Sequence, residues 1–177
     1  MYSAYQRINN IFALLSTCIF ALLGAIALSS FVFTADPKGS LSIGSLKVYP
    51  GRSPHFKQLR KEYAFVNFEV HADLSPLFHW NTKQLFVYLG AEYTSADGTR
   101  NDVVIWDRII RRKEDANLNV KGRNKYEFRD VAVSFKNVTP AHYTLKYNTM
   151  PYVGVLTYSE AARTDNAIPF PLAQERV

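Results

Sequence analysis

Cysteine is almost missing from the sequence, since Cys18 is the only one among 177 residues. One cysteine excludes an intrachain disulfide and a cysteine-based zinc site. Without the apolar segment that surrounds Cys18, about 140 residues remain, which is the size of one ordinary domain. A domain of this size buries enough surface to fold without disulfide or metal staples. We therefore expect one domain with no structural cofactor.

The familiar signatures of catalytic sites are also missing. The chain has no G-x-S-x-G, no H-E-x-x-H and no glycine-rich loop that could cradle a phosphate. His71 falls on the polar side of a predicted strand and His79 stands beside Trp80 in a predicted turn, so we expect surface or hydrogen-bonding roles for both. The sequence therefore predicts no catalytic centre, no metal site, no cofactor and no small-molecule substrate.

The formal charge of the chain is mildly positive, at +6. Its one basic stretch is interrupted by Glu114 and Asp115, as in a solvated connection between strands. This pattern argues against nucleic acid as a partner. The basic residues of the stretch are Arg108, Arg111, Arg112, Lys113, Lys121, Arg123 and Lys125.

A long apolar run lies near the N-terminus, where residues 11–33 carry no charged side chain. As a helix this run would be about 34 Å long, against a hydrocarbon core of about 30 Å. We therefore predict a short cytosolic tail at residues 1–10, a transmembrane helix at residues 11–33 and a lumenal domain at residues 34–177.

A cleaved signal peptide is the alternative interpretation, because Ala25-Ile26-Ala27 has the small-x-small pattern of a cleavage site. The apolar run continues past this point to residue 33, which favours an uncleaved anchor. Basic residues flank the run on both sides, so the charge rule does not decide its orientation. A ten-residue tail is easily kept in the cytosol, and we predict a single-pass type II membrane protein.

After the apolar run the pattern repeats every two residues. Residues 63–72, 131–135 and 143–147 alternate in this way, and turn signals such as Pro50-Gly51 and Met150-Pro151 separate the runs. Such alternation is typical of half-buried strands. Several short strands at this spacing predict a mainly β fold, an antiparallel β-sandwich.

Residues 83–112 contain a predicted β-hairpin. Asp97-Gly98 is a two-residue turn signal, and a turn there would pair Leu85 with Ile110. Both faces of the hairpin would then be apolar, although a sandwich buries only one of them. We expect the second face to be covered either by another chain or by loops of this one. The first face would hold Leu85, Val87, Leu89, Ala91, Val104, Trp106 and Ile110, and the second Phe86, Tyr88, Val103, Ile105 and Ile109.

Asn137-Val138-Thr139 is a glycosylation sequon, placed after residues 131–135 where a turn would be exposed. Pro140 follows it directly and argues against its use. A glycan on Asn137 would agree with a lumenal domain.

The run Phe78–Tyr88 reads F-H-W-N-T-K-Q-L-F-V-Y, and A-E-Y at 91–93 and V-V-I-W-D at 103–107 follow it. With the N-terminal span, the sequon and Pro169-Phe170-Pro171, this pattern resembles the third subunit of the eukaryotic signal peptidase complex, the 22/23 kDa subunit family. Tryptophan, asparagine, lysine and glutamine at fixed spacing before an apolar strand make the pattern specific. Pro140 and the basic Arg111-Arg112-Lys113 loop depart from it.

The resemblance implies a non-catalytic subunit of the endoplasmic reticulum enzyme that removes signal peptides, with the catalytic residues in another subunit. Its partners would be the catalytic and other subunits and the lipid bilayer, and the lumenal β-sandwich would hold the catalytic subunit near the membrane. We therefore expect a subunit contact at Phe86, Tyr88, Ile105 and Ile109, and a structural turn fixed by Trp80, Asn81 and Gln84.

Two other functions stay open from the residues. A stand-alone lumenal module that binds cargo or peptide would run alone after mild detergent extraction, whereas a subunit would run with a membrane complex. An independent hydrolase would cleave its substrate when purified alone and would lose that activity on substitution of one serine or histidine. The absence of catalytic signatures makes the hydrolase the weakest of the three hypotheses.

Overall fold

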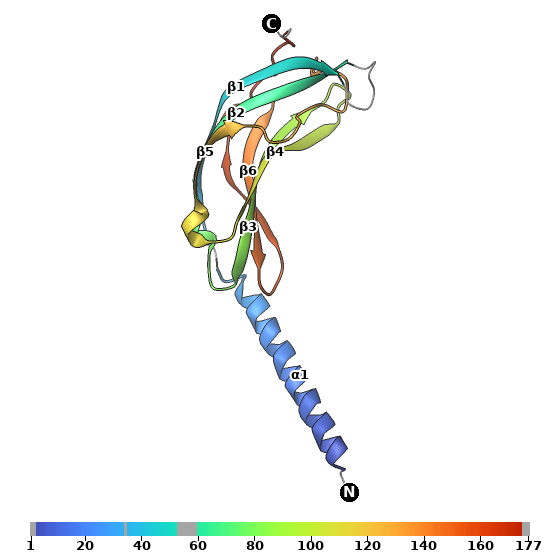
Figure 1. Cartoon of the computed structure of the whole chain (residues 1–177), viewed down its shortest axis with the longest axis vertical. Helices are drawn as coiled ribbons and strands as arrows, with labels where there is room; N and C mark the ends of the chain where they lie inside the picture. The colour runs from blue at the N-terminus through green and yellow to red at the C-terminus, as the bar shows by residue number, and fades with distance from the viewer. Residues whose placement is uncertain (1–2, 34, 53–59, 175–177) are drawn as a thin grey trace.

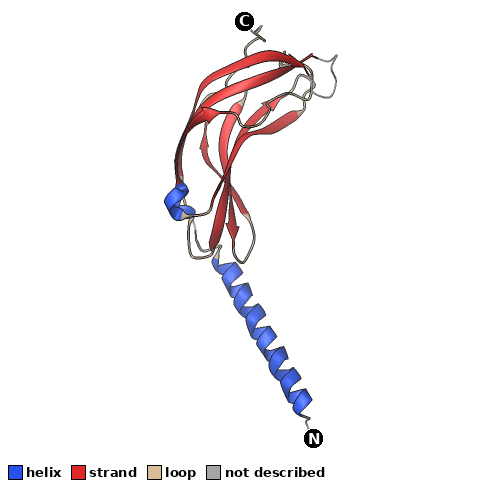
Figure 2. Cartoon of the chain, viewed as in Figure 1, coloured by secondary structure: helices blue, strands red, loops and turns tan. Residues whose placement is uncertain are grey.

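The computed structural model describes residues 3–33, 35–52 and 60–174. Helix α1 (Ala4–Ser29) extends from one end of a β-sandwich (Figures 1 and 2), so the fold is mainly β with one N-terminal helix, as predicted. The strands are β1 (Lys38–Arg52), β2 (Arg60–Asp73), β3 (Thr82–Thr94), β4 (Arg100–Ile110), β5 (Asn117–Arg123), β6 (His142–Pro151) and β7 (Thr157–Arg163). Two short 3-10 helices, η1 (Ser75–Leu77) and η2 (Lys113–Ala116), precede β3 and β5.

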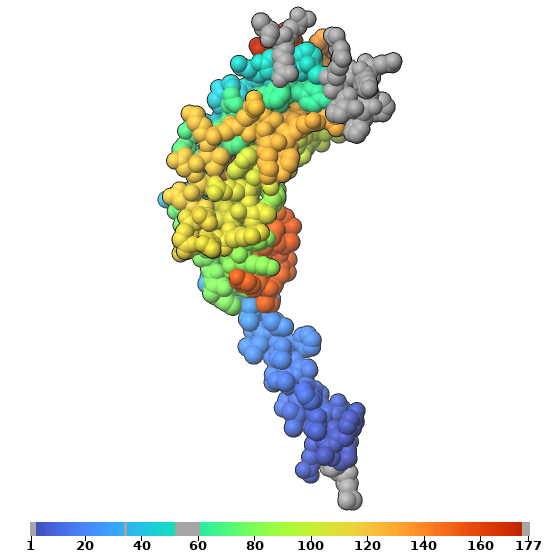
Figure 3. All heavy atoms as spheres, viewed as in Figure 1, coloured from blue at the N-terminus to red at the C-terminus, as the bar shows by residue number. Residues whose placement is uncertain are grey.

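Helix α1 begins after Ser3, whose hydroxyl accepts a hydrogen bond from the Gln6 N–H. It is long and apolar enough to cross a membrane, and Figure 3 shows that all but its last turns stand clear of the sandwich. The helix ends at Ser29, before the predicted end at residue 33. Tight turns follow, in which the N–H groups of Phe31 and Val32 donate to the carbonyls of Leu28 and Ser29.

Two antiparallel sheets form the sandwich, which confirms the predicted architecture. One sheet has the strand order β1-β2-β5 and the other has the order β4-β3-β6-β7. Their inner faces enclose the core. Alternate side chains of β2, β3 and β6 are buried, as residues 63–72 and 143–147 predicted: Ala64, Val66, Phe68, Val70, Ala72, Leu85, Val87, Leu89, Ala91, Tyr143, Leu145 and Tyr147.

The turn between β3 and β4 contains three residues, so the prediction of a two-residue turn at Asp97-Gly98 is wrong. The Ser95 N–H donates to the Thr99 carbonyl at 2.9 Å, and the Asp97 carboxylate accepts a bond from the Thr99 N–H at 2.9 Å. Gly98 has a φ of 86°, which suits the left-handed residue that ends a three-residue hairpin loop.

A bulge in β4 corrects the register after this turn. Ile105 is the extra residue, and the pairing shifts by one there, so Leu85 still pairs with Ile110 as predicted. The bulge turns Ile105 into the core, where it is 0% exposed, and turns Val104 outward, where it is 39% exposed. Val103 packs against the core. The predicted faces of Val103, Val104 and Ile105 are therefore wrong.

Residues 131–135 do not form the predicted strand. Val131 is 83% exposed, while Phe135 is buried against the rings of Phe128 and Phe170, and Glu62 binds the segment between them. The Glu62 N–H donates to the Val133 carbonyl at 3.0 Å, while the Glu62 carboxylate accepts bonds from the Ser134 hydroxyl and the Phe135 N–H. These bonds hold the segment as a loop, because they replace the backbone ladder that a strand would need.

The two sheets approach each other at both lateral edges of the sandwich. On one side β1 runs beside β7, so close that a Cβ on Gly39 would lie 3.0 Å from the Ala161 carbonyl oxygen. On the other side the N–H groups of Lys125 and Tyr126 both donate to the Ile105 carbonyl, at 2.8 and 3.2 Å. The bulge residue thus binds the segment that follows β5.

Candidate functional site

Four apolar side chains form a surface that we call the outer patch: Phe86, Tyr88, Val104 and Ile109. They lie on the outer face of β3 and β4, where Phe86 pairs with Ile109 and the rings of Phe86 and Tyr88 stack at 5.5 Å. Ile109 is 48% exposed and Val104 39% exposed, so loops of this chain do not cover them. Ile105, which was predicted for this surface, is buried, and Val104 takes its place.

A group of charged side chains borders the outer patch, and we call Glu92, Asp102, Lys146 and Arg163 the charge cluster. Lys146 pairs with Tyr88 across the β3-β6 ladder. Its ammonium lies 2.6 Å from a carboxylate oxygen of Glu92 and 2.6 Å from one of Asp102, and Arg163 lies 3.5 Å from Glu92. Asp107 pairs with Tyr88 from the other side, across the β3-β4 ladder, so charged side chains border Tyr88 on both sides.

The electrostatics of the charge cluster follow from these contacts. Burial acts most strongly on Lys146 and opposes its charge, but hydrogen bonds to Asp102 and Glu92 outweigh it and raise the pKa of Lys146 to about 12. The hydrogen bond from Lys146 holds the pKa of Glu92 below its usual value. Both groups are charged at neutral pH, so the cluster is an ion-pair network.

Asn81 joins the sandwich to the helix. Its side-chain N–H donates to the Ser30 hydroxyl at 2.9 Å and to the Val153 carbonyl at 2.7 Å, while its carbonyl accepts a bond from the Val153 N–H at 3.1 Å. The Asn81 backbone carbonyl accepts a further bond from the Tyr152 N–H. Asn81 is 2% exposed. We call Ser30, Asn81 and Val153 the helix joint.

The other residues predicted for this turn are placed differently. Trp80 is 59% exposed and is not part of the buried core. Gln84 donates from its amide to the Met150 sulfur at 3.1 Å, across the β3-β6 pair. Thr82, which the sequence did not single out, closes the turn because its hydroxyl donates to the Leu77 carbonyl at 2.9 Å. Ser30 and Val153 were also missed, because they are 51 and 72 positions from Asn81 and no local pattern connects them.

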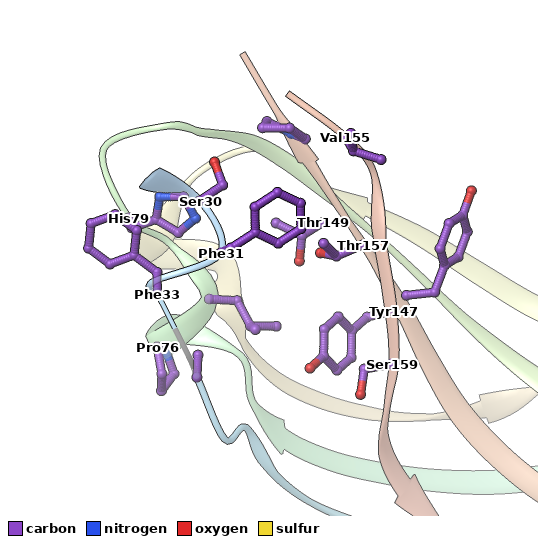
Figure 4. Close-up of a pocket in the computed structure, with 14 residues that line it drawn as sticks. Ser30, Phe31, Phe33, Pro76, His79, Tyr147, Thr149, Val155, Thr157 and Ser159 are labelled. Atoms are coloured by element: carbon purple, nitrogen blue, oxygen red, sulfur yellow. The ribbon is translucent and has the colours of Figure 1, made fainter. Parts of the chain in front are cut away.

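A cavity of about 400 Å³ lies beside the helix joint, and we call it the joint pocket (Figure 4). Phe31 and Phe33 from the helix exit, and Tyr147 and Val155 from the β6-β7 hairpin, line it. Figure 4 shows the Phe33 and His79 rings side by side, with centroids 4.8 Å apart. Burial lowers the pKa of His79, so the imidazole is neutral at neutral pH. The pocket suits an apolar group better than an ion.

Two of the remaining predicted polar residues are placed differently. His71 is exposed and contacts Glu69 at 3.3 Å. Lys125 of the basic stretch reaches the outer patch, because it contacts Asp107 at 2.7 Å and Asp107 pairs with Tyr88 across the β3-β4 ladder. Among the residues that the structure describes, no group of three or more histidine, cysteine, aspartate or glutamate side chains could hold a metal ion.

The sequon lies at the end of the sandwich that carries the aromatic side chains Tyr93, Phe128, Phe135 and Phe170. Asn137 is exposed in a turn and has a φ of 59°. The Thr139 hydroxyl accepts a bond from the Thr94 N–H at 2.8 Å, which ties the sequon to the end of β3. Glycosylation of Asn137 stays a prediction.

Comparison with known proteins assigns the family. The family model described as "Signal peptidase subunit" matches residues 1–173. Signal peptidase complex subunit 3 of Yarrowia lipolytica is 34% identical, over 97% of this chain and 98% of its own length. The subunit 3 proteins of Dictyostelium discoideum and Gallus gallus are 30% and 33% identical, over at least 95% of both chains. The helix, the sandwich and these matches together show that the chain belongs to the signal peptidase complex subunit 3 family.

Proposed function

We propose that this protein is a non-catalytic subunit of the signal peptidase complex and that it holds the catalytic subunit through the outer patch. Membership of the family gives a subunit of this complex, the endoplasmic reticulum membrane and a part in signal peptide processing. The finer role is supported by one observation: two aromatic and two aliphatic side chains share an outer sheet face, which is exposed to solvent unless a partner covers it.

The composition of this surface fits a protein partner. Interfaces are enriched in aromatic side chains at their centre and carry polar groups at their rim. The outer patch offers the stacked rings of Phe86 and Tyr88, with the charge cluster on one side and the Asp107–Lys125 ion pair on the other. Ion pairs within the cluster leave few unpaired charges, which lowers the cost of removing water when a partner covers Phe86 and Tyr88.

Orientation is the second part of the proposal: the N-terminus is cytosolic and the sandwich is lumenal. Two features support it, the short tail before the span and the exposed sequon at Asn137. Treatment of the membrane-bound protein with endoglycosidase tests this orientation. A loss of mass that Asn137→Gln abolishes supports it. If a second sequon introduced on the surface of the sandwich also receives no glycan, the lumenal orientation is contradicted.

The outer patch is tested by co-purification of the complex after mild detergent extraction. Tyr88→Asp and Val104→Asp each place a charge on the patch and should release the catalytic subunit. Val131→Asp is the matched control, because Val131 is equally apolar, is 83% exposed and lies in the loop 131–135 outside the patch. Intact assembly with both patch variants would remove the outer patch from the proposal.

Depletion of the protein from its own cells tests the role itself. Pulse-labelled secretory precursors should keep their signal peptides, and the intact chain should restore cleavage. The two patch variants should fail to restore it while Val131→Asp succeeds. Normal processing in depleted cells, with the protein running alone in detergent, would instead favour a stand-alone lumenal binding module.

A further inference from the structure

Large apolar side chains gather around the point where the helix meets the sandwich. We call Phe31, Val32, Trp80, Tyr152, Val155 and Leu156 the membrane-facing rim. They come from three segments: the helix exit, the turn before β3 and the β6-β7 connection. Val32 is 79% exposed, Val155 68% and Trp80 59%. Side chains of this size and exposure on one end of a domain mark a surface that is covered in use.

The helix joint fixes the rim at the level of the helix end. Asn81 binds Ser30 and Val153, and the Cα of Ala27 lies 3.5 Å from the position that a Cβ of Gly154 would take. The β6-β7 connection therefore touches the last turns of α1. Because these contacts are direct, the depth of the helix in a bilayer also sets the depth of the rim.

The length of the helix determines how deep the membrane-facing rim lies in the bilayer. From Ile11, which follows two asparagines, to Ser29 the helix rises about 28 Å at about 1.5 Å per residue. The hydrocarbon core of a bilayer is about 30 Å thick. The apolar part of α1 is thus about as long as the hydrocarbon core is thick. No further helical turn separates the sandwich from the membrane surface.

The chemistry of the rim matches the layer in which this geometry puts it. Tryptophan and tyrosine prefer the boundary between lipid headgroups and acyl chains, where the ring is apolar and the N–H or O–H is wet. The rim has one of each, Trp80 and Tyr152, beside aliphatic side chains and without a charged member. The joint pocket opens among the same segments and is also largely apolar.

We infer that the membrane-facing rim is immersed in the interfacial layer of the bilayer, so that lipid binds the sandwich directly as well as the helix. The occupant of this surface is membrane lipid, because the surface is continuous with a helix that crosses the bilayer. The inference depends on that crossing and on the helix joint. It does not depend on the contact proposed for the outer patch, which lies on β3 and β4.

Depth-dependent fluorescence quenching tests this inference with the full chain in phosphatidylcholine vesicles. Two variants separate the two tryptophans: Trp106→Phe leaves Trp80, and Trp80→Phe leaves Trp106. Trp106 is the matched control because it packs against Phe68 inside the sandwich, with ring centroids 5.7 Å apart. Lipids brominated near the headgroup end of the acyl chain should reduce the Trp80 emission to less than half and leave the Trp106 emission unchanged.

Two results would overturn the inference. Quenching of Trp80 by aqueous iodide, without quenching by brominated lipid, would show that the rim is in water. Protection of Trp80 from both quenchers would show that a second copy of the chain covers the rim.

Val155→Cys in a Cys18→Ser background gives the same comparison without a tryptophan substitution. A spin label there should be more accessible to oxygen, which partitions into lipid, than to a water-soluble nickel complex, and the reverse order would contradict the inference.

Discussion

Substitution of Asn81 by aspartate changes the helix joint with almost no change in shape. The aspartate keeps the oxygen that accepts a bond from the Val153 N–H. It loses both bonds that the amide N–H group donates, to the Ser30 hydroxyl and to the Val153 carbonyl. In place of the 2.7 Å hydrogen bond to that carbonyl, two oxygens face each other. We expect the helix to come loose from the sandwich.

The magnitude follows from the number of bonds lost. Two hydrogen bonds contribute about 1–3 kcal/mol together, and the unpaired Val153 carbonyl adds about 1–3 kcal/mol. The free energy of unfolding should therefore fall by about 2–6 kcal/mol, since Asn81 is 2% exposed and water does not easily replace the lost donor. For a domain of this size the melting temperature falls by about 2–4 °C per kcal/mol, which gives about 4–24 °C.

Two measurements check this expectation in the full chain in detergent. Thermal unfolding gives the change in melting temperature, and hydrogen exchange reports the Tyr152 and Val153 amides, which bind the Asn81 carbonyl groups. Asn67→Asp is the control: it makes the same chemical change at an exposed asparagine whose amide donates one bond, to Ser45 at 2.8 Å. It should cost less than about 1 kcal/mol.

The pH dependence separates a lost donor from a general loss of packing. A carboxyl buried in the helix joint is disfavoured in its charged form, so its folded-state pKa is raised. Below that pKa the protonated aspartate can donate one hydrogen bond again. The loss of unfolding free energy caused by Asn81→Asp should therefore become smaller as the pH falls. A melting temperature equal to that of Asn67→Asp, with unchanged exchange at Tyr152 and Val153, would refute the assigned role of Asn81.

Three further predictions test the hairpin and the charge cluster. Ile105→Ala should lower the free energy of unfolding by about 2–5 kcal/mol in chemical denaturation, because Ile105 is fully buried; a surface residue would show almost no change. Gly98→Ala should cost about 1–2 kcal/mol at a φ of 86° in the same assay, and Gly98→Asn clearly less. Glu92→Gln removes a carboxyl whose pKa lies below 4.5 in the folded state, so the stabilisation by Glu92 is present above pH 4.5 and is lost as the pH falls through the folded value. Denaturation curves should show that Glu92→Gln lowers the free energy of unfolding at neutral pH and has no effect in acid. A loss of stability that grows in acid would contradict the ion pair with Lys146.

Much of the sandwich could be predicted from residue patterns, because one face of each central strand meets the core and the other meets water. Residues 63–72 alternate for this reason, and their predicted buried positions are all buried. Residues 131–135 alternate in the same way, yet Val131 is 83% exposed. The two segments differ in the hydrogen-bond partners of their backbones. Residues 63–72 pair with neighbouring strands, whereas residues 131–135 bind Glu62, which is distant in the sequence.

The outer patch shows a second limit of prediction from sequence. Phe86, Tyr88 and Ile109 were assigned to the correct face, since strand alternation fixes the face once one pair is known. The bulge at Ile105 exchanged that residue for Val104. The bulge is held by N–H groups of Lys125 and Tyr126, and no pattern within 83–112 reveals them. Contacts that set a register can lie outside the segment whose register is being predicted.

The covered edges of the sandwich bear on the proposed lumenal placement. A domain in the lumen of the endoplasmic reticulum would meet extended polypeptides, and an open sheet edge would pair with them through its free backbone groups. Here the segment after β5 caps the middle of β4 at the Ile105 carbonyl, while β1 and β7 shield each other. Arg100 and Arg108 add charge to the rest of β4. The carbonyl of the bulge residue is therefore already occupied, which leaves one fewer free backbone group on β4 with which an extended chain could pair.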